Sequence, residues 1–322
     1  MNKKNALFFA LPLFLSFGCQ PRRPTDTNST IFSNHETQQR NRFEERIHEN
    51  WIQGFTVDRI LLEKKFGLQE LVIFENKEFG RVMALDGVIQ LAEADEFIYH
   101  EMLTHVPLLA HGNAKKILVI GGGDGGILRE VLRHPTVESV VHVEIDQSVI
   151  ELSKEWLPNI SKGAFDDPRV QIVLADGAKY VQETQDRFDV VICDSTDPIG
   201  LGETLYSPEF FANCKRILNP KGIFVNQNGV PFIQGSEVTD TYKSIKDHFA
   251  VKTFYLAPVP TYTGGHMTFA WATDCTEYSN LSEEVLEQRM RKIKGEMRYY
   301  TPAVHHAAFA LPRYIQELFA NS

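Results

Sequence analysis

The chain has 322 residues, of which 43% are hydrophobic and 23% are charged. This composition is typical of a soluble globular protein, and the length leaves room for one large and one smaller domain. The 42 acidic residues outnumber the 33 basic ones, for a formal charge of −9, which argues against nucleic acid as the main partner. The four cysteines contain no C-x-x-C pair and the histidines no metal-binding spacing, so we expect no metal centre and no disulfide framework.

Residues 1–42 are expected to be an extension that precedes the folded protein. Two lysines are followed by an apolar run at residues 6–17, too short to span a bilayer, and then by Cys19. This order resembles a secretory or lipoprotein signal, but Phe17 is bulkier than such signals usually carry, and the cysteine usage favours a reducing compartment. We favour a poorly ordered extension on a cytoplasmic protein, with export or a lipid anchor on the membrane as the alternative.

Residues 43–106 are predicted to form a small antiparallel β domain. Its short apolar stretches are separated by turn signals, and Asp86-Gly87 is a strong hairpin signal. Residues 93–109 then show helical spacing, which we expect to break near Pro107. Residues 107–322 are predicted to be the larger domain.

The larger domain is organised around one strand and a glycine loop. Residues 117–120 are aliphatic and mostly β-branched, which is typical of a strand buried on both faces. Gly121, Gly123 and Gly126 follow with the spacing G-x-G-x-x-G, which lets the backbone approach a nucleotide closely and precedes a helix. We therefore expect this loop to contact a nucleoside.

Two acidic residues indicate which nucleoside suits the loop. The next predicted strand, residues 140–145, carries Glu144 near its end, where a carboxylate can accept hydrogen bonds from ribose hydroxyls. Asp124 lies inside the glycine loop and would repel a pyrophosphate. NAD and FAD are therefore disfavoured, and a nucleoside that carries positive charge is favoured.

Later strands also end in acidic residues. Residues 170–174 are followed by Asp176-Gly177, where the carboxylate could accept from an adenine amino group or cap the next helix. Residues 188–193 are followed by Asp194 and Asp197 on an irregular loop, the place where open α/β sheets hold their chemistry.

Strands and helices alternate along the larger domain, which predicts an α/β fold with a doubly wound sheet. Further strands are expected at residues 222–227, 251–255 and 268–272, and a turn at residues 219–222. The helices are expected at residues 147–157, 208–218, 239–249 and 281–297.

Several blocks of sequence occur in the order expected of one family. They are FENKEFGRVMALDGVIQLAEADEFIYHEMLTHVPLLAHG, GGGDGGILREV, VEID, DSTDPIG, GIFVNQNGVPF and a tail that begins RYY. In these blocks, from roughly residue 43 to the C-terminus, the chain resembles the polyamine aminopropyltransferase family, and within it the bacterial spermidine synthases. The resemblance implies a methyltransferase-like (Rossmann-like) catalytic domain preceded by the small antiparallel β domain, and a homodimer or homotetramer.

The resemblance also implies a reaction. In this family decarboxylated S-adenosylmethionine donates an aminopropyl group to putrescine, yielding spermidine and 5′-methylthioadenosine without a metal or redox cofactor. Putrescine is a dication near neutral pH because its ammonium groups have pKa values of about 10, so a carboxylate must remove a proton before the nitrogen can attack. Matching the family's D-S-T-D motif to this sequence makes Asp194 the base. The other motif residues, assigned to the amine site, are Ser195, Thr196 and Asp197, the last of which would hold an ammonium group.

Asp124 gains a selective role from the same reaction. Ordinary S-adenosylmethionine carries a carboxylate on the arm where the decarboxylated donor has none. Asp124 would repel that carboxylate and pair with the terminal ammonium of the decarboxylated donor.

The remaining site residues are assigned only by the resemblance. Those that match the donor nucleoside site are Gln69, Gly121, Gly123, Glu144 for the ribose, and Asp176 with Gly177 for the adenine. Those that match the acceptor channel are Tyr99, His100 and Tyr262, although core packing is the ordinary role of such aromatic residues.

Alternatives stay open at this point. Leu201, Thr263 and His266 depart from choices usual in the family, so agmatine, cadaverine or spermidine could replace putrescine as acceptor. Other classes are an S-adenosylmethionine-dependent methyltransferase, a dinucleotide-dependent oxidoreductase and a catalytically silent polyamine-binding protein. Asp124 argues against the first two, and the acidic residues on the donor side argue against the third.

Overall fold

The computed structural model describes residues 41–66, 69–196 and 200–320. The signal-like run, Cys19 and Asp197 lie outside these residues. Within the described ranges, no helix is long and apolar enough to cross a bilayer.

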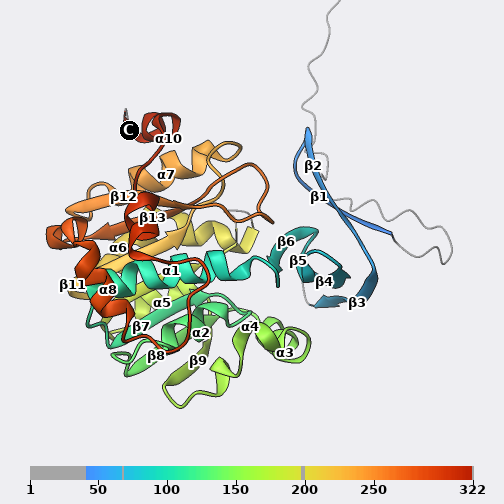
Figure 1. Ribbon diagram of the computed structural model, residues 1–322, viewed down its shortest axis with the longest axis horizontal. Helices are drawn as coiled ribbons and strands as arrows, with labels where there is room; N and C mark the ends of the chain where they lie inside the picture. The colour runs from blue at the N-terminus through green and yellow to red at the C-terminus, as the bar shows by residue number, and fades with distance from the viewer. Residues whose placement is uncertain (1–40, 67–68, 197–199, 321–322) are drawn as a thin grey trace, which may run out of the picture. The chain divides into compact units, whose positions relative to one another are not determined.

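The predicted antiparallel β structure near the N-terminus is confirmed as two sheets (Figure 1). Asp86 and Gly87 connect the last two strands with φ values of 49° and 82°, as a two-residue hairpin turn requires. The first sheet pairs β1 (Arg42–His48) with β2 (Trp51–Thr56), and the second pairs β3 (Arg59–Phe66), β4 (Gln69–Asn76), β5 (Gly80–Leu85) and β6 (Val88–Ala92) in sequence order.

The predicted doubly wound sheet is confirmed and has seven strands in the order β12-β13-β11-β10-β7-β8-β9. Five consecutive strands, from β11 to the edge strand β9, are parallel, and β13 is antiparallel to both of its neighbours. The chain runs outward from β7 through β8 to β9 and then returns to β10, so the order reverses between β7 and β10. The strands are β7 (Lys116–Gly121), β8 (Ser139–Glu144), β9 (Val170–Leu174), β10 (Phe188–Asp194), β11 (Leu218–Gln227), β12 (Val251–Ala257) and β13 (Met267–Thr273).

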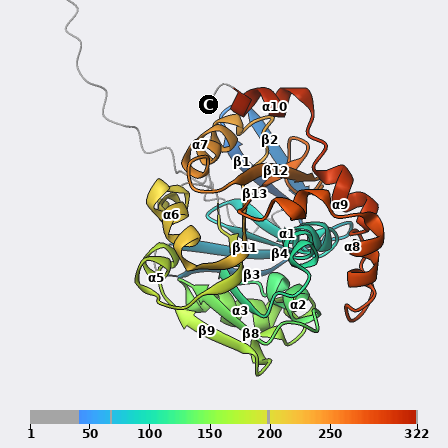
Figure 2. The same ribbon diagram turned by 90° about the vertical axis from the view of Figure 1, so that its left-hand side faces the viewer.

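Helices cover both faces of this sheet, and Figure 2 shows α5 and α6 on one side and α1, α2 and α8 on the other. Ile117 and Val119 of β7 are buried against α1 and α2, whereas Leu118 and Ile120 are buried against α5 and α6. Because both faces are covered, all four buried residues of the strand, 117–120, are apolar. The helices are α1 (Glu96–His111), α2 (Gly126–Leu132), α3 (Gln147–Trp156), α4 (Pro158–Ser161), α5 (Gly177–Glu183), α6 (Pro208–Ile217), α7 (Gly235–Ile245), α8 (Glu283–Met290), α9 (Pro302–Ala308) and α10 (Arg313–Ala320).

The expected break near Pro107 is wrong, because α1 continues through Pro107 to His111. A proline inside a helix costs about 3 kcal/mol through its missing N–H and its steric clash. Most residues of α1 are buried, and this packing outweighs the local cost.

Other predicted boundaries are also wrong, and the helix expected at residues 239–249 is α7, which runs from Gly235 to Ile245. The turn expected at residues 219–222 belongs to β11, where Lys221 has a φ of 66° and the pairing with β10 shifts register. The Asn-Pro-Lys-Gly signal therefore marks an irregularity within a strand. The helix expected at residues 281–297 ends at Met290, and Gly295 has a φ of 78°, a conformation that a helix cannot continue through.

Candidate active site

The carboxyl ends of β7 and β10 meet at the point where the strand order reverses. Gly121 lies opposite Asp194 in the ladder, and the N–H of Gly122 donates to the carbonyl oxygen of Asp194 at 3.1 Å. A Cβ atom on Gly121 would lie 2.0 Å from that oxygen, and the φ of Gly121 is 77°, so only glycine fits. Open α/β sheets bind their ligands in this crevice.

Tyr99 of α1 points at the carboxylate of Asp194. Its hydroxyl donates to Asp194 Oδ1 at 2.5 Å. Burial, followed by the negative charge of Asp124, raises the pKa of Asp194 to about 7. Burial and Asp194 together raise the pKa of Tyr99 well above its usual value, so the phenol stays a neutral donor. The site thus holds a carboxyl group poised to exchange a proton near neutral pH.

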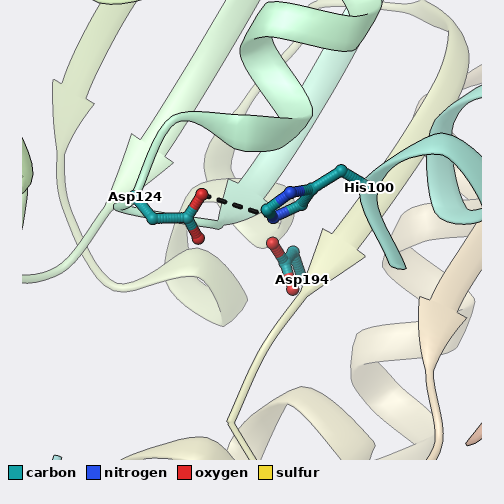
Figure 3. A group of neighbouring side chains, drawn as sticks. All are labelled: His100, Asp124 and Asp194. Atoms are coloured by element: carbon teal, nitrogen blue, oxygen red, sulfur yellow. Dashed lines mark ion pairs between the residues drawn. The ribbon is translucent and has the colours of Figure 1, made fainter. Parts of the chain in front are cut away.

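His100, also on α1, connects to the glycine loop (Figure 3). Its Nε2 lies 3.3 Å from Asp124 Oδ1, and its Nδ1 lies 2.5 Å from Glu96 Oε2. Burial acts to lower the pKa of His100, but Asp124 and Glu96 raise it to about 10. The pKa of Asp124 is lowered in turn, because His100 and the N–H of Gly126, which donates at 2.6 Å, outweigh burial.

One side-chain polar atom from each of His100, Asp124 and Asp194 lies within 4.8 Å of the other two, and Figure 3 shows the three side chains converging. Two carboxylates at this spacing match an ammonium group, which needs nearby negative charge. The partner of Asp124 in the structure is His100. Its pairing with the donor's terminal ammonium stays a prediction.

A small cavity opens beside Tyr99 and His100 and includes Tyr262, so the structure brings together the three aromatic residues assigned to the acceptor channel. The ring of Tyr262 meets that of Tyr99 edge-on at 5.8 Å, and its hydroxyl donates to the Gln90 carbonyl oxygen at 2.7 Å. The cavity is lined by Leu91, Ala92, Asp95, Glu96, Tyr99, His100, Val259, Thr261 and Tyr262.

Sequence reasoning missed Asp95, Glu96 and Thr261 on this cavity. Asp95 Oδ2 accepts from the N–H of Thr261 at 2.7 Å and from its hydroxyl, which joins the start of α1 to the loop that carries Tyr262. Burial raises the pKa of Asp95, against the effect of these hydrogen bonds. The available signal was helical spacing, because Asp95 and Glu96 precede Tyr99 and His100 by one turn.

On the donor side, Glu144 ends β8 next to the glycine loop. Its Oε1 accepts from the N–H groups of Ile145 at 2.7 Å and Asp146 at 3.0 Å. A Cβ atom on Gly123 would lie 2.8 Å from Val149 Cγ1 and 2.9 Å from Glu144 Oε2, which favours a glycine there. Burial raises the pKa of Glu144. Glu144 and Gly123 are therefore adjacent, as a ribose site formed by both would need.

Asp176 caps α5, accepting from the N–H groups of Ala178 at 2.8 Å and Lys179 at 3.2 Å, so the capping alternative is confirmed. A Cβ atom on Gly177 would lie 2.4 Å from Ile120. Gln69 begins β4 and pairs with Phe66 of β3. The contacts of Asp176, Gly177 and Gln69 with a nucleoside stay predictions.

The segment after Asp194 is held by two residues that sequence reasoning did not single out, Tyr206 and Gln227. Gln227 Nε2 donates to the Ser195 carbonyl oxygen at 2.9 Å and to the Tyr206 hydroxyl at 2.7 Å. Ser195 Oγ donates to the Tyr206 hydroxyl at 3.1 Å, and that hydroxyl donates to the Thr196 carbonyl oxygen at 3.2 Å. Ser195 and Thr196 thus lie beside Asp194, whereas Asp197 is outside the described residues.

Two family models match the chain. The one described as spermine/spermidine synthase domain matches residues 96–283, and the one described as spermidine synthase tetramerisation domain matches residues 42–93.

Curated relatives and solved structures agree with these matches. Polyamine aminopropyltransferases of Escherichia fergusonii and Shigella flexneri serotype 5b are each 52% identical over 283 residues, which is 88% of this chain and 98% of theirs. A spermidine synthase solved in complex with the transition state analogue AdoDATO superposes with a TM-score of 0.83 at 38% identity, covering 88% of this chain and 97% of that one. The spermidine synthase of Thermotoga maritima gives 0.82 at 37% identity, with 88% and 96% covered. The chain therefore belongs to the spermine/spermidine synthase family and is a transferase of the polyamine aminopropyltransferase type.

Proposed function

We propose that the protein transfers the aminopropyl group of decarboxylated S-adenosylmethionine to putrescine, forming spermidine and 5′-methylthioadenosine. The observation that carries the proposal is the placement of Asp194, which accepts from Tyr99 at 2.5 Å and has a carboxylate oxygen within 4.8 Å of one on Asp124. The likeness to a spermidine synthase solved with AdoDATO supports it. We also propose that no metal or redox cofactor takes part.

In this mechanism Asp194 accepts a proton from one ammonium group of putrescine. The freed lone pair attacks the methylene carbon next to the sulfonium, a C–N bond forms, and the C–S bond electrons return to sulfur as 5′-methylthioadenosine leaves. The donor is already activated, so the protein mainly aligns the reactants, which can lower a barrier by about 7–11 kcal/mol.

The neighbouring groups divide the binding tasks. Tyr99 orients Asp194, and Asp124 holds the terminal ammonium of the donor. Asp197, Ser195 and Thr196 complete the amine site. The nucleoside is held by Gln69, Gly121, Gly123, Glu144, Asp176 and Gly177.

A product assay tests the proposal. The purified protein is incubated with decarboxylated S-adenosylmethionine and one amine at a time, and both products are followed by mass spectrometry. We expect spermidine from putrescine, and loss of both products in Asp194→Asn by about 10²–10⁴-fold, the range for removal of a general base. The exposed Asp240→Asn variant on α7 is the matched control. Donor binding without product from any amine would refute the proposal.

Acceptor choice and reaction class are tested in the same assay. Agmatine, cadaverine and spermidine replace putrescine in parallel reactions, and product ranking identifies the preferred amine. Methyl transfer from ordinary S-adenosylmethionine would instead support the runner-up, a methyltransferase on the same fold.

We further propose that the protein forms a homodimer or homotetramer through β1 and β2. Ile47, Trp51 and Ile52 expose 37%, 41% and 43% of their surface there, which is unusual for large apolar side chains clustered on one hairpin. The segment also matches the tetramerisation model. Light scattering should give two or four chain masses, and Trp51→Lys should lower that number.

A cytoplasmic location also stays a proposal. Mass spectrometry of the mature N-terminus, in protein from its native source, distinguishes an intact extension from a cleaved or lipid-modified one at Cys19.

A further inference from the structure

His100 is held between two carboxylates. Its Nδ1 lies 2.5 Å from Glu96 Oε2 and its Nε2 lies 3.3 Å from Asp124 Oδ1. An ionised carboxylate only accepts hydrogen bonds, so both ring nitrogens must donate, which requires the doubly protonated imidazolium. With its side chain only 2% exposed, His100 depends on these two partners for that charge.

Glu96 is in turn held by Arg129 of α2. Arg129 Nη2 lies 2.8 Å from Glu96 Oε2 and Nη1 lies 3.2 Å from Oε1, a two-pronged contact between side chains that are 10% and 8% exposed. Arg129 is itself anchored, because it donates to the Ile160 carbonyl oxygen at 2.7 Å and to Glu130 Oε1 at 2.7 Å. Such a fork restricts both the position and the charge of the carboxylate.

These contacts form an ion-pair chain, which we define as Asp124, His100, Glu96 and Arg129. Charges alternate in sign along it, and its first member lies next to Asp194. The groups that face His100 are Glu96 from α1, Asp124 from the glycine loop and Asp194 from β10, with Arg129 and Glu130 of α2 behind Glu96.

We propose that Glu96 and Arg129 are positioning residues for aminopropyl transfer. They hold His100 as an imidazolium aimed at Asp124. This keeps Asp124 ionised, so that it can bind the terminal ammonium of the donor. The proposal rests on the proposed function for its catalytic consequence. Glu96 lines the cavity beside Tyr99, but in this role neither residue needs to touch a reactant, since both act on Asp124 through His100.

Removing Arg129 has a consequence with a definite sign. Glu96 would become a buried carboxylate whose remaining partner in the ion-pair chain is His100. It would take the proton from His100 Nδ1, which gives a neutral pair. Asp124 and Asp194 would then lose the positive charge that lowers the pKa of each. Both carboxyl groups would stay protonated to higher pH, so activity would be lost earlier as pH falls.

The test compares Arg129→Gln with Arg133→Gln. Arg133 is a matched control because it also contacts Glu130, but its other contacts are the carbonyl oxygens of Lys294 and Glu296. We expect the acidic limb of kcat/KM in Arg129→Gln to move up by about one pH unit. At pH values above that limb, kcat/KM should fall by less than it does on the limb. Arg133→Gln should keep the wild-type limb, and Arg129→Lys should restore part of the shift. A limb that stays in place in folded Arg129→Gln, or a loss equal at all pH values, would overturn the proposal.

A second readout does not depend on turnover. Nitrogen NMR of histidine-labelled protein gives the protonation state of His100, whose signals are assigned through His100→Gln. In the wild type at pH 8 both ring nitrogens should be protonated. In Arg129→Gln one of them should be deprotonated, and Glu96→Gln takes its place should that variant not fold. An inactive wild type with this NMR pattern would refute the proposed function alone. An unchanged His100 signal in the folded variants would refute the ion-pair chain.

Discussion

The hydroxyl of Tyr99 donates to Asp194 Oδ1 at 2.5 Å, across 95 residues of sequence. It joins the helix that precedes the glycine loop to the end of the strand that carries the proposed base. Because the pKa of Tyr99 is raised well above its usual value by burial and by Asp194, the proton of this hydrogen bond belongs to the phenol. The contact therefore favours the ionised form of Asp194.

Tyr99→Phe should make Asp194 harder to ionise. A hydrogen bond to a charged group contributes about 1.5–3 kcal/mol, so the acidic limb of kcat/KM should move up by about one pH unit and kcat/KM at pH 7 should fall about fivefold. Initial rates between pH 6 and 9.5 measure this. Tyr314→Phe, at a tyrosine of α10 that is 42% exposed, should match the wild type. Equal loss at pH 6 and pH 9 would show that the hydroxyl does not act through Asp194.

Asp124→Asn should weaken selection of the donor. The amide keeps the size of the carboxylate but no longer attracts an ammonium or repels a carboxylate, so decarboxylated S-adenosylmethionine should bind about tenfold more weakly or worse, and ordinary S-adenosylmethionine at least as well as before. Calorimetric titration with each compound gives the two affinities. An unchanged ratio between them in the variant would contradict the selective role of Asp124.

Much of the fold follows from local pattern. The apolar run of β7 and the Asp86-Gly87 hairpin are set by neighbours in the sequence, which is why both could be predicted. The continuation of α1 through Pro107 could not be predicted, because a proline is tolerated there only since α1 is buried from several sides. The register shift near Lys221 likewise depends on pairing with β10.

The site divides in the same way. Acidic residues at strand ends could be identified because parallel strands end at one edge. The contact of Arg129 with Glu96 spans 33 residues, and that of Gln227 with the Ser195 carbonyl spans 32, so no spacing rule reveals them. Gly121 illustrates the limit, since its predicted role was approach to a nucleotide, whereas the structure shows that a side chain there would collide with the Asp194 carbonyl oxygen.

Gly126→Ala should disrupt the site through His100. A Cβ atom there would lie 2.2 Å from the imidazole ring, which cannot turn away without losing Glu96 and Asp124. We expect a loss of about 1–3 kcal/mol in the free energy of unfolding, as for other overpacked sites, and at least a tenfold loss of activity. Denaturant titration and initial rates measure the two effects. The control is Gly235→Ala, whose Cβ atom would meet only the flexible Leu318 side chain at 3.2 Å, and it should lose neither stability nor activity. Wild-type stability in Gly126→Ala would contradict the steric argument.

Asp194→Asn should stabilise the ligand-free protein at alkaline pH while it abolishes turnover. The pKa of Asp194 is raised to about 7 in the folded state by burial and by Asp124, compared with about 3.9 in an unfolded chain. A group with a raised folded pKa contributes stability that is fully present below its unfolded pKa and is lost as pH rises through the folded value. Above pH 7 the ionised Asp194 should therefore lower the stability of the wild type, whereas asparagine stays neutral. The Tm of the variant should exceed that of the wild type at pH 8.5, and the difference should shrink as pH falls toward 4. A variant less stable than the wild type at pH 8.5 would mean that the charge on Asp194 is already compensated within the empty site, and that its pKa is not raised by the crowding of carboxylates.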